Sequence, residues 1–318
     1  MAKTKAADEK PMRERTPAYR RVGHKGADAI TEGNTIESFE AAVDAGVDMI
    51  ELDILRDRDG RLVVAHDHQD ALSRRPLTLP EALVAFLEPP LDKVEIDCDL
   101  KLPGREAELA GALAGHGLIE RAMVSTMEIS SLQKLRQLEP ELRLGWTFPK
   151  TRRDWTRSRW AGPGVAAGVA ALRRRFPKQL ARKAPELDVD AVWVYHPIAT
   201  PRLVEAAEEA GVELIAWTVD ELDRMVELLR MGVDGVCSND PRLFEQAERT
   251  VEGAGSPPAE RHEEDGKDEG PEQDARAGET DGAAQAAEDT KGEGGEKKRG
   301  EKKERAEKKE RDAGKSGA

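Results

Sequence analysis

The most chemically suggestive part of the sequence is a pair of apolar runs that carry acidic residues at alternate positions. The run VDMIELDIL contains Glu51 and Asp53, whose spacing puts both side chains on one face of a β-strand. The run VEIDCDLKL carries four charged residues at the same period: Glu95, Asp97, Asp99 and Lys101. Charges on one strand face are costly to bury unless they pair or bind a metal ion. Two such strands side by side predict a hard divalent cation held by carboxylate oxygens.

Two histidines end strand-like runs and supply groups for acid–base catalysis. His24 ends the run YRRVGH and His66 ends RLVVAH. Because the ordinary pKa of histidine lies near neutrality, one ring can act as a base while the other acts as an acid. Lys25 and Lys101 add positive charge, which suits an anionic substrate such as a phosphate ester. A cation and two lysines would stabilise the extra negative charge that develops on phosphorus.

The elements that must position these residues alternate regularly along the chain. Short β-like runs and amphipathic helical stretches follow one another about eight times between residues 19 and 250. This alternation is typical of parallel strands with right-handed crossovers, and eight units over roughly 230 residues predict an α/β fold, the TIM (β/α)8 barrel. The sequence contains no GxGxxG or GxxxxGKS/T loop, which disfavours an open nucleotide-binding sheet. Catalytic groups of such barrels lie at the carboxyl ends of the strands.

Composition divides the rest of the chain. Residues 251–318 contain no Leu, Ile, Phe, Trp, Tyr, Met or Cys, so we expect a disordered charged C-terminal tail. Residues 1–18 form a basic leader that is also expected to be disordered, which leaves 19–250 as the barrel. Cys98 and Cys237 lie in apolar runs and are expected to be buried thiols.

Charge and hydropathy bear on whether the protein binds nucleic acid, spans a membrane or is secreted. The net charge of −13 argues against nucleic acid as a partner. No apolar run approaches the length of a membrane span, and the first 15 residues lack the apolar core of a secretory signal. These observations lead us to expect a cytoplasmic protein.

One segment, residues 149–188, breaks the alternation between the fifth and sixth predicted strands. Within it, the stretch 150–183 carries 11 Lys and Arg residues against one acidic residue, together with Trp155 and Trp160. We expect a basic insertion over the barrel mouth. It is interpreted either as a solvated lid or as a segment that makes peripheral contact with an anionic membrane.

Several motifs, in their order along the chain, resemble those of a known family. The run GHKGADAITEGNTIESFEAAVDAGVDMIELDILRDRDGRLVVAHD resembles the opening of the glycerophosphodiester phosphodiesterases, with their His-Arg-Gly, Glu-Asn-Thr, Glu-x-Asp and His-Asp elements. The run IAWTVDELDRMVELLRMGVDGVCSNDP resembles the family's Trp-Thr-Val-Asn and its closing Gly-Val-Asp-Gly-Ile-x-Thr-Asp-x-Pro. The resemblance covers residues 19–244, and the combination is far more specific than any single element.

The resemblance implies a TIM barrel that hydrolyses glycerophosphodiesters to glycerol 3-phosphate and an alcohol, with one divalent cation, Ca²⁺ or Mg²⁺. By position in the motifs, His24 and His66 become the acid–base pair. Glu51 and Asp53 become metal ligands. Asp99, in the run Asp-Leu-Lys, takes the place of the Glu in a family Glu-x-Lys and becomes the third ligand.

The same carry-over assigns the substrate contacts and a reaction path. Lys25 and Lys101 would bind the phosphate, and Trp217 would line the glycerol or leaving-group side. One histidine would deprotonate a neighbouring glycerol hydroxyl, which attacks phosphorus while the other histidine protonates the leaving alcohol. Water would then open the cyclic phosphate. Asp97 lies deeper than Asp99 and either supports the ligands, which we favour, or binds the cation itself. His196 is left open between a pocket residue and a structural one.

The sequence departs from the family pattern at several places. Lys25 stands where the family has Arg, which keeps the charge but loses bidentate phosphate geometry. Gly33 replaces a Glu, for which Glu32 is the nearest substitute, and Asp99 is shorter than Glu. Residues 238–241 read SNDP where the family has Thr-Asp-x-Pro. These changes bear on substrate preference more than on the reaction class.

Two alternatives remain open beside this interpretation. The first is a lysophospholipase D-like or sphingomyelinase D-like enzyme that releases a cyclic phosphate. The second is a weakly catalytic barrel that binds anionic lipid or a protein partner through its basic insertion and its charged tail. The expected partner is a small-molecule phosphodiester, and the sequence points to no obligate protein partner.

Overall fold

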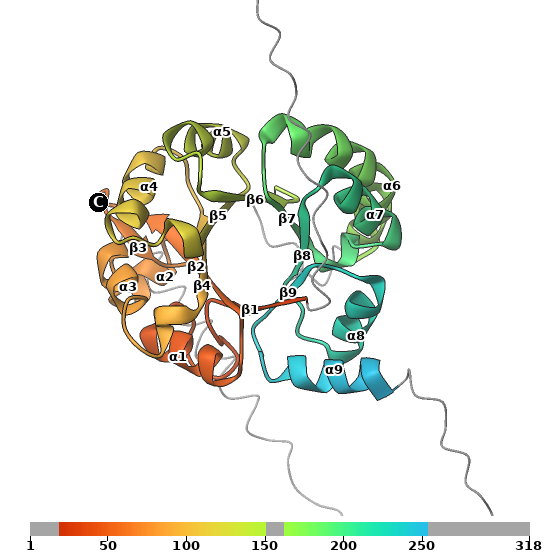
Figure 1. Cartoon of the computed structure of the whole chain (residues 1–318), viewed down its shortest axis with the longest axis horizontal. Coiled ribbons are helices and arrows are strands. Elements are labelled where there is room, and N and C mark those ends of the chain that lie inside the picture. Colours follow the sequence, from red (N-terminus) through yellow and green to blue (C-terminus); the bar gives the residue numbers. More distant parts are fainter. Residues whose placement is uncertain (1–18, 151–161, 254–318) are drawn as a thin grey trace, which may run out of the picture. The chain divides into compact units, whose positions relative to one another are not determined.

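A closed barrel of parallel strands forms the centre of the fold (Figure 1). The computed structural model describes residues 19–150 and 162–253. In these ranges eight parallel strands close through the pairing of β1 with β2, and β3 adds to β2 as an antiparallel hairpin. This arrangement confirms the predicted TIM barrel. The leader, residues 151–161 and residues 254–318 lie outside the described residues, and with them Trp155 and Trp160.

The strands follow the predicted apolar runs closely. Alternate side chains point into the barrel, so the pleat alone decides which residues of each run can meet at its mouth. The bounds are β1 Arg20–His24, β2 Met49–Arg56, β3 Leu62–Val64, β4 Glu95–Leu100, β5 Ala122–Thr126, β6 Arg143–Phe148, β7 Ala191–Tyr195, β8 Glu213–Trp217 and β9 Gly235–Ser238.

Helices cover the outside of the barrel (Figure 1). Thr35, Thr78 and Thr200 each accept a backbone N–H at a helix N-terminus, which sets where α1, α3 and α7 begin. The bounds are α1 Ile36–Asp44, α2 Asp70–Ser73, α3 Leu79–Ala85, α4 Glu106–Gly115, α5 Ile129–Leu138, α6 Gly162–Leu187, α7 Pro201–Ala210, α8 Leu222–Met231 and α9 Leu243–Gly253, with short 3-10 turns at Leu91–Lys93, Ile119–Arg121 and His196–Ile198.

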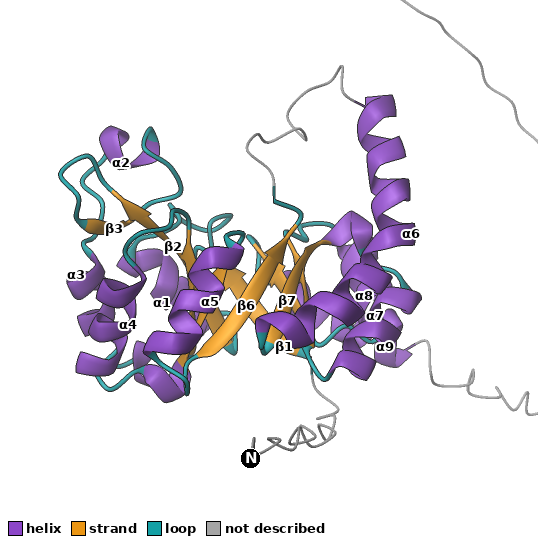
Figure 2. Ribbon diagram, turned by 90° about the horizontal axis from the view of Figure 1, so that it is seen from above, coloured by secondary structure: helices purple, strands orange, loops and turns teal. Residues whose placement is uncertain are grey.

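Two helix boundaries differ from the sequence-based expectation. α9 continues to Gly253, so the first three residues assigned to the tail are helical. Most of the predicted insertion is α6, whose amino-terminal half rises beyond the carboxyl ends of the strands (Figure 2). In the described ranges, no helix combines the length and the apolar character that a membrane span requires.

The core has two parts, one on each side of the barrel wall. Outside it, large side chains such as Phe39, Phe176 and Phe244 pack between the strands and the helices. Inside it, a smaller apolar cluster fills the barrel: Val22, Met49, Met123, Ala191, Trp193, Ile215 and Cys237. Cys98 and Cys237 are both buried free thiols, as predicted.

A layer of paired charges closes the amino-terminal end of the barrel. Arg20, Glu95, Arg143 and Glu213 are the first residues of the alternate strands β1, β4, β6 and β8. Arg20 pairs with Glu95 and, at 3.2 Å, with Glu213, while Arg143 lies 3.0 Å from Glu95. Such layers from alternate strands are a property of TIM barrels. Because these four residues are level, so are the residues four positions further along: His24, Asp99, Thr147 and Trp217.

Replacing Gly145 with Ala is expected to destabilise the barrel. The added Cβ would lie 2.6 Å from Trp193 Nε1 and 3.0 Å from Ser125 Cβ inside the packed barrel. Overpacking of this kind costs about 1–3 kcal/mol in the free energy of unfolding, which urea titration followed by tryptophan fluorescence measures. Gly111→Ala is the matched control, because that helical glycine has nothing within 4 Å of its Cβ position and should gain about 0.5–1 kcal/mol.

Candidate active site

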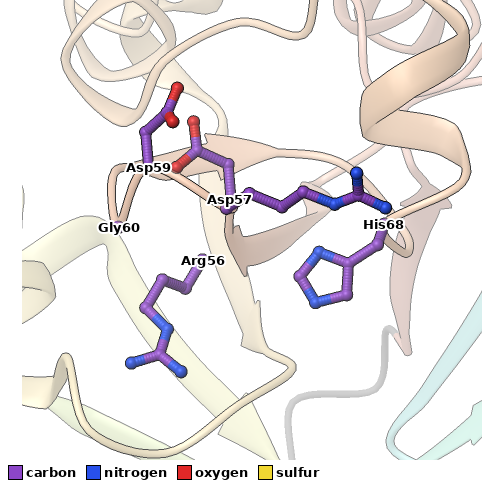
Figure 3. Close-up of a pocket in the computed structure, with 6 residues that line it drawn as sticks. Arg56, Asp57, Asp59, Gly60 and His68 are labelled. Atoms are coloured by element: carbon purple, nitrogen blue, oxygen red, sulfur yellow. The ribbon is translucent and has the colours of Figure 1, made fainter.

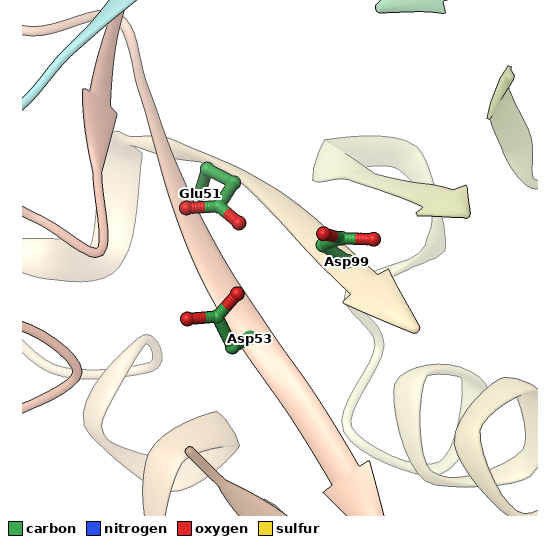
Figure 4. Close-up of side chains that lie close together, drawn as sticks. All are labelled: Glu51, Asp53 and Asp99. Carbon is green, nitrogen blue, oxygen red and sulfur yellow. The ribbon is translucent and has the colours of Figure 1, made fainter. Parts of the chain in front are cut away.

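Three buried carboxylates from two neighbouring strands form the centre of the site (Figure 4). Glu51 and Asp53 lie on β2 and Asp99 lies on β4, where the register pairs Asp53 with Asp99. One oxygen of each carboxylate lies within 4.8 Å of one oxygen of each of the others. Hard oxygen donors gathered at this spacing suit Ca²⁺ or Mg²⁺, so the residues present fit a divalent cation.

Lys101 is the nearest positive charge to this cluster. Its ammonium group forms ion pairs with both Asp53 and Asp99. Burial acts to lower the pKa of Lys101, but the neighbouring Asp53 and Asp99 carboxylates outweigh it and raise the pKa well above the ordinary value. Lys101 therefore carries its charge at all working pH values, and its side chain keeps about a fifth of its surface exposed.

The three carboxylates differ in how readily they ionise. Burial, and next the adjacent Asp53 carboxylate, raise the pKa of Glu51 well above its ordinary value. Burial also raises the pKa of Asp99, against the opposing effect of Lys101. At Asp53 burial acts in the same direction, but Lys101 and the two histidines outweigh it and lower the pKa. Because a cation displaces protons from its carboxylate ligands, these shifts make the cation affinity of the cluster depend on pH.

His24 lies against the cluster. It ends β1, and its Nε2 lies 3.9 Å from Glu51 Oε2, while its Nδ1 lies 2.6 Å from Asn239 Oδ1. Burial, followed by the charge of Lys25, lowers the pKa of His24 to about 4. The imidazole is therefore neutral near pH 7, which is the state of a general base.

His66 occupies the exposed rim beside the cluster. It follows β3 by two residues, and more than half of its side chain is exposed. The Ala65 N–H donates to the Asp53 carbonyl, which holds this part of the hairpin next to the carboxylates. The His66 N–H donates to Asp70, and its ring lies 3.3 Å from Asp67. The structure thus places both histidines at the mouth of the barrel, in different environments.

Lys25 begins a tight loop that accounts for one departure from the family pattern. Its backbone has φ 52°, its N–H donates to Glu51, and its Nζ lies 3.2 Å from Asp28 Oδ2. The Gly33 N–H donates to Asp28 Oδ1, and a Cβ on Gly33 would lie 2.5 Å from that oxygen. Asp28 thus occupies the space beside Gly33. Glu32 is mostly exposed and lies 3.7 Å from Arg74, so it does not supply the missing carboxylate.

Asn34 positions Asp53, a role that the sequence analysis missed. Its Nδ2–H donates to Asp53 Oδ2 at 2.7 Å, and its Oδ1 accepts the Asp53 N–H at 3.1 Å. Asn34 is 1% exposed and has φ 61°, a conformation that Asn tolerates better than most residues. The place of Asn34 in the family's Glu-Asn-Thr element was the sequence signal that could have identified this role.

Asp97 lies one inward position below Asp99 and accepts a hydrogen bond from Ser125.

The wall opposite the carboxylates carries two unsatisfied polar groups. Trp217 and Thr147 share the layer of His24 and Asp99, and the buried Trp217 Nε1 and Thr147 Oγ1 have no hydrogen-bond partner among the described residues. Buried donors of this kind are normally satisfied, so they are available to a ligand. His196, in contrast, accepts a hydrogen bond from Arg224 of α8 and is held in the wall.

A separate cavity of about 430 Å³ lies in the β2–β3 hairpin (Figure 3). Its lining residues are Arg56, Asp57, Arg58, Asp59, Gly60 and His68. None of them belongs to the predicted site, and Asp57 and Asp59 are both paired with Arg61. The chemistry described above therefore lies elsewhere, at the ends of β1, β2 and β4.

Comparison with known proteins points to one family. The model of the Glycerophosphoryl diester phosphodiesterase family matches residues 24–74 and 104–243. A glycerophosphodiester phosphodiesterase of Caldanaerobacter subterraneus is 28% identical over 70% of this chain and 95% of its own length. That match includes almost the whole of the relative.

Solved structures share the fold. A glycerophosphodiester phosphodiesterase of Parabacteroides distasonis matches with a TM-score of 0.56 and 18% identity, over 74% of this chain and 98% of its own. An Oleispira antarctica phosphodiesterase, solved in complex with the product sn-glycerol-3-phosphate, matches with a TM-score of 0.54 and 18% identity, over 72% of this chain and 96% of its own.

Replacing Asn34 with Gly is expected to weaken cation binding by about 10–100-fold, because Asp53 loses the amide that orients it. Gly accepts the positive φ of this position, so the variant removes the side chain with little backbone strain. Isothermal titration of the metal-free protein with Ca²⁺ or Mg²⁺ measures the affinity. Glu32→Gln, which changes an exposed carboxylate outside the cluster, is the control, and equal affinities of Asn34→Gly and wild type would contradict this role of Asn34.

Proposed function

This chain belongs to the glycerophosphoryl diester phosphodiesterase family and is a phosphoric diester hydrolase, and we propose that one divalent cation and two histidines carry out its reaction. The substrates are glycerophosphodiesters, which are cleaved to glycerol 3-phosphate and an alcohol. The observation that carries the proposal is the group of three buried carboxylates beside a neutral imidazole. The product bound to the Oleispira antarctica relative supports the same chemistry.

Glu51, Asp53 and Asp99 hold the cation, which is Ca²⁺ or Mg²⁺ and which, when bound, polarises a phosphoryl oxygen of the substrate. Lys101 lies between Asp53 and Asp99 and can turn its ammonium group toward the phosphate. Lys25 adds a second positive charge at the mouth, where Asp28 holds it. Together these charges favour the phosphate and the additional charge of the transition state.

His24 acts as the base. Its neutral ring removes the proton from a glycerol hydroxyl next to the phosphate, and the resulting oxygen forms a bond to phosphorus. The bond from phosphorus to the leaving oxygen breaks, and His66 gives that oxygen a proton. The product is an alcohol and a cyclic phosphate, which water opens to glycerol 3-phosphate. The exposed position of His66 suits this role, because the leaving alcohol departs toward solvent.

Trp217 and Thr147 face the organic part of the substrate in this arrangement. Their unsatisfied polar atoms can bond to glycerol oxygens, and the indole ring supplies an apolar surface. Trp193 forms the floor beneath them, since its ring lies over Gly145 and its Nε1–H points to Met123.

Removing divalent cations is expected to abolish the release of glycerol 3-phosphate from glycerophosphocholine. Adding Ca²⁺ or Mg²⁺ after the chelator should restore release, because Lys101 alone balances only part of the charge of the three carboxylates that face the phosphate. An enzyme-coupled assay of glycerol 3-phosphate measures the rate and identifies the preferred ion. Full turnover in excess chelator would contradict the role of the cation.

The same assay tests the histidines. His24→Ala and His66→Ala should keep the circular dichroism spectrum and lose turnover by about 10²–10⁴-fold, which is the usual contribution of a proton-transfer group. His116→Ala is a suitable control, since that histidine lies at the end of α4, outside the proposed site. Near-wild-type rates in either site variant would show that the acid–base pair is misassigned.

A second candidate function is hydrolysis of lysophospholipids at an anionic membrane. The observation that favours it is α6, whose first turns rise above the mouth and expose small apolar residues, followed by Arg173, Arg174 and Arg175 (Figure 2). Apolar surface next to a cluster of arginines is typical of segments that rest on anionic lipid. A cyclic product from a lysophospholipid, seen by phosphorus NMR, would favour a lysophospholipase D-like or sphingomyelinase D-like enzyme.

Charge reversal on α6 is expected to release the protein from anionic vesicles. Arg174→Glu and Arg175→Glu should each weaken binding to phosphatidylglycerol vesicles by about fivefold or more, from about 1 kcal/mol per basic side chain. Cosedimentation measures binding, and phosphatidylcholine vesicles give the baseline. Arg230→Glu, on an exposed residue in the last turn of α8, is the matched control. If Arg174→Glu and Arg175→Glu bind the vesicles as well as Arg230→Glu and wild type do, α6 has no role in membrane binding. Vesicle binding by a protein that turns over no substrate would favour the weakly catalytic barrel.

A further inference from the structure

A hydrogen bond on the far side of His24 determines where its ring carries a proton. His24 Nδ1 lies 2.6 Å from Oδ1 of Asn239, which directly follows β9. A neutral imidazole has one N–H and one lone pair, so the tautomer depends on whether its partner donates or accepts. An amide side chain can do either, depending on which of its two ends faces the ring.

Asp220 decides which end of the Asn239 amide faces His24. The Asn239 Nδ2–H donates to Asp220 Oδ2 at 2.7 Å, and the Asn239 backbone N–H donates to Asp220 Oδ1 at 2.9 Å. A carboxylate only accepts hydrogen bonds, so the NH₂ end must point to Asp220. The amide oxygen is then left for the imidazole. A flipped amide would set its oxygen against the carboxylate and lose the Nδ2–H hydrogen bond to Asp220.

The loop around Asn239 is held firmly enough to keep this arrangement. Ser238 Oγ lies 3.2 Å from Asp220 Oδ1 and donates to it. The Ala29 N–H, from the loop that begins at Lys25, donates to the Asn239 carbonyl at 3.0 Å. Asn239 is therefore anchored through both its backbone and its side chain, to Asp220 after β8 and to Ala29 in the loop after β1.

From these contacts we infer that Asp220, acting through Asn239, holds His24 as the Nδ1–H tautomer with the Nε2 lone pair directed at the carboxylate cluster. Among the described residues no hydrogen bond keeps a proton on Nε2, because the Glu51 Oε2 carboxylate oxygen lies 3.9 Å away. Asp220 and Asn239 are positioning residues. The inference rests on the proposed role of His24 as the base, since only the Nδ1–H tautomer presents a lone pair to the substrate side.

The same contacts connect two departures from the family motifs. Asp220 ends Trp-Thr-Val-Asp where the family has Asn, and Asn239 stands in SNDP where the family has Asp. The two side chains are exchanged. An Asp at 239 would accept the Nδ1–H with a charged oxygen. Here the neutral amide of Asn239 accepts it, and the negative charge lies behind that amide, on Asp220. Either arrangement orders the ring in the same tautomer.

The test compares three variants with wild type: Asp220→Asn, Asn239→Asp and the double exchange. Long-range ¹H–¹⁵N NMR of the metal-free protein near neutral pH reads the tautomer of His24, and kcat and KM for glycerophosphocholine are measured on the cation-loaded protein. Wild type should show a protonated Nδ1 and a bare Nε2. Asp220→Asn should lose this clear signature and lower kcat by about tenfold or more, with little change in KM.

The double exchange is expected to restore both the tautomer and most of kcat relative to Asn239→Asp, which places two carboxylates side by side. Rescue of this kind is a coupling between the two residues that independent structural roles would not produce. Asp240→Asn is the matched control. Asp240 neighbours Asn239, but its carboxylate pairs with Arg242, so the variant should leave the His24 signals and kcat unchanged.

Two results would overturn the inference. One is a wild-type His24 protonated at Nε2, and the other is an Asp220→Asn protein with the wild-type tautomer and kcat. A protein with the expected tautomer but no turnover of glycerophosphodiesters would contradict the proposed function instead, and would leave the assignment of the tautomer supported.

Discussion

Mutual repulsion among three buried carboxylates is the constraint on which the rest of this site depends. Glu51, Asp53 and Asp99 lie within reach of one ion, and Lys101 balances only part of their charge. The surrounding groups are arranged to hold these carboxylates in place: the Lys25 N–H bonds to Glu51, and the Asn34 amide bonds to Asp53. A buried charge cluster of this kind persists only when its geometry is fixed on every side.

The opposite end of the barrel supplies the rigid frame. There the charges of Arg20, Arg143, Glu95 and Glu213 are paired with one another, which locks four alternate strands at one level. Between the two charged layers, an apolar cluster that includes Val22, Met123 and Ile215 fills most of the barrel interior, and the buried Asp97 is hydrogen-bonded to Ser125. The barrel thus keeps a neutralised charge layer for stability at one end and an unbalanced one for chemistry at the other.

Several departures from the family motifs occur at residues that contact one another, so that one change accompanies another. At the first loop, Lys25 pairs with Asp28, and Gly33 leaves room for that carboxylate, which would lie 2.5 Å from a Cβ at this position. At the last strand, Asp220 and Asn239 exchange an acid and an amide while keeping a hydrogen-bond acceptor on His24. In each place the chain replaces two residues together, which preserves the geometry around the cluster and alters the charge next to it.

The sequence by itself determined the barrel and most of the cluster, because both follow from local periodicity. Alternate residues of a strand share a face, so Glu51 with Asp53, and Asp99 with Lys101, could be grouped without coordinates. Asp28, Thr147 and Asn239 were not predicted as members of the site. Asn239 meets His24 across 215 residues of sequence, and Thr147 joins its layer only because the strands close into a ring. Contacts of this kind depend on barrel closure and loop conformation, so only the tertiary structure decided them.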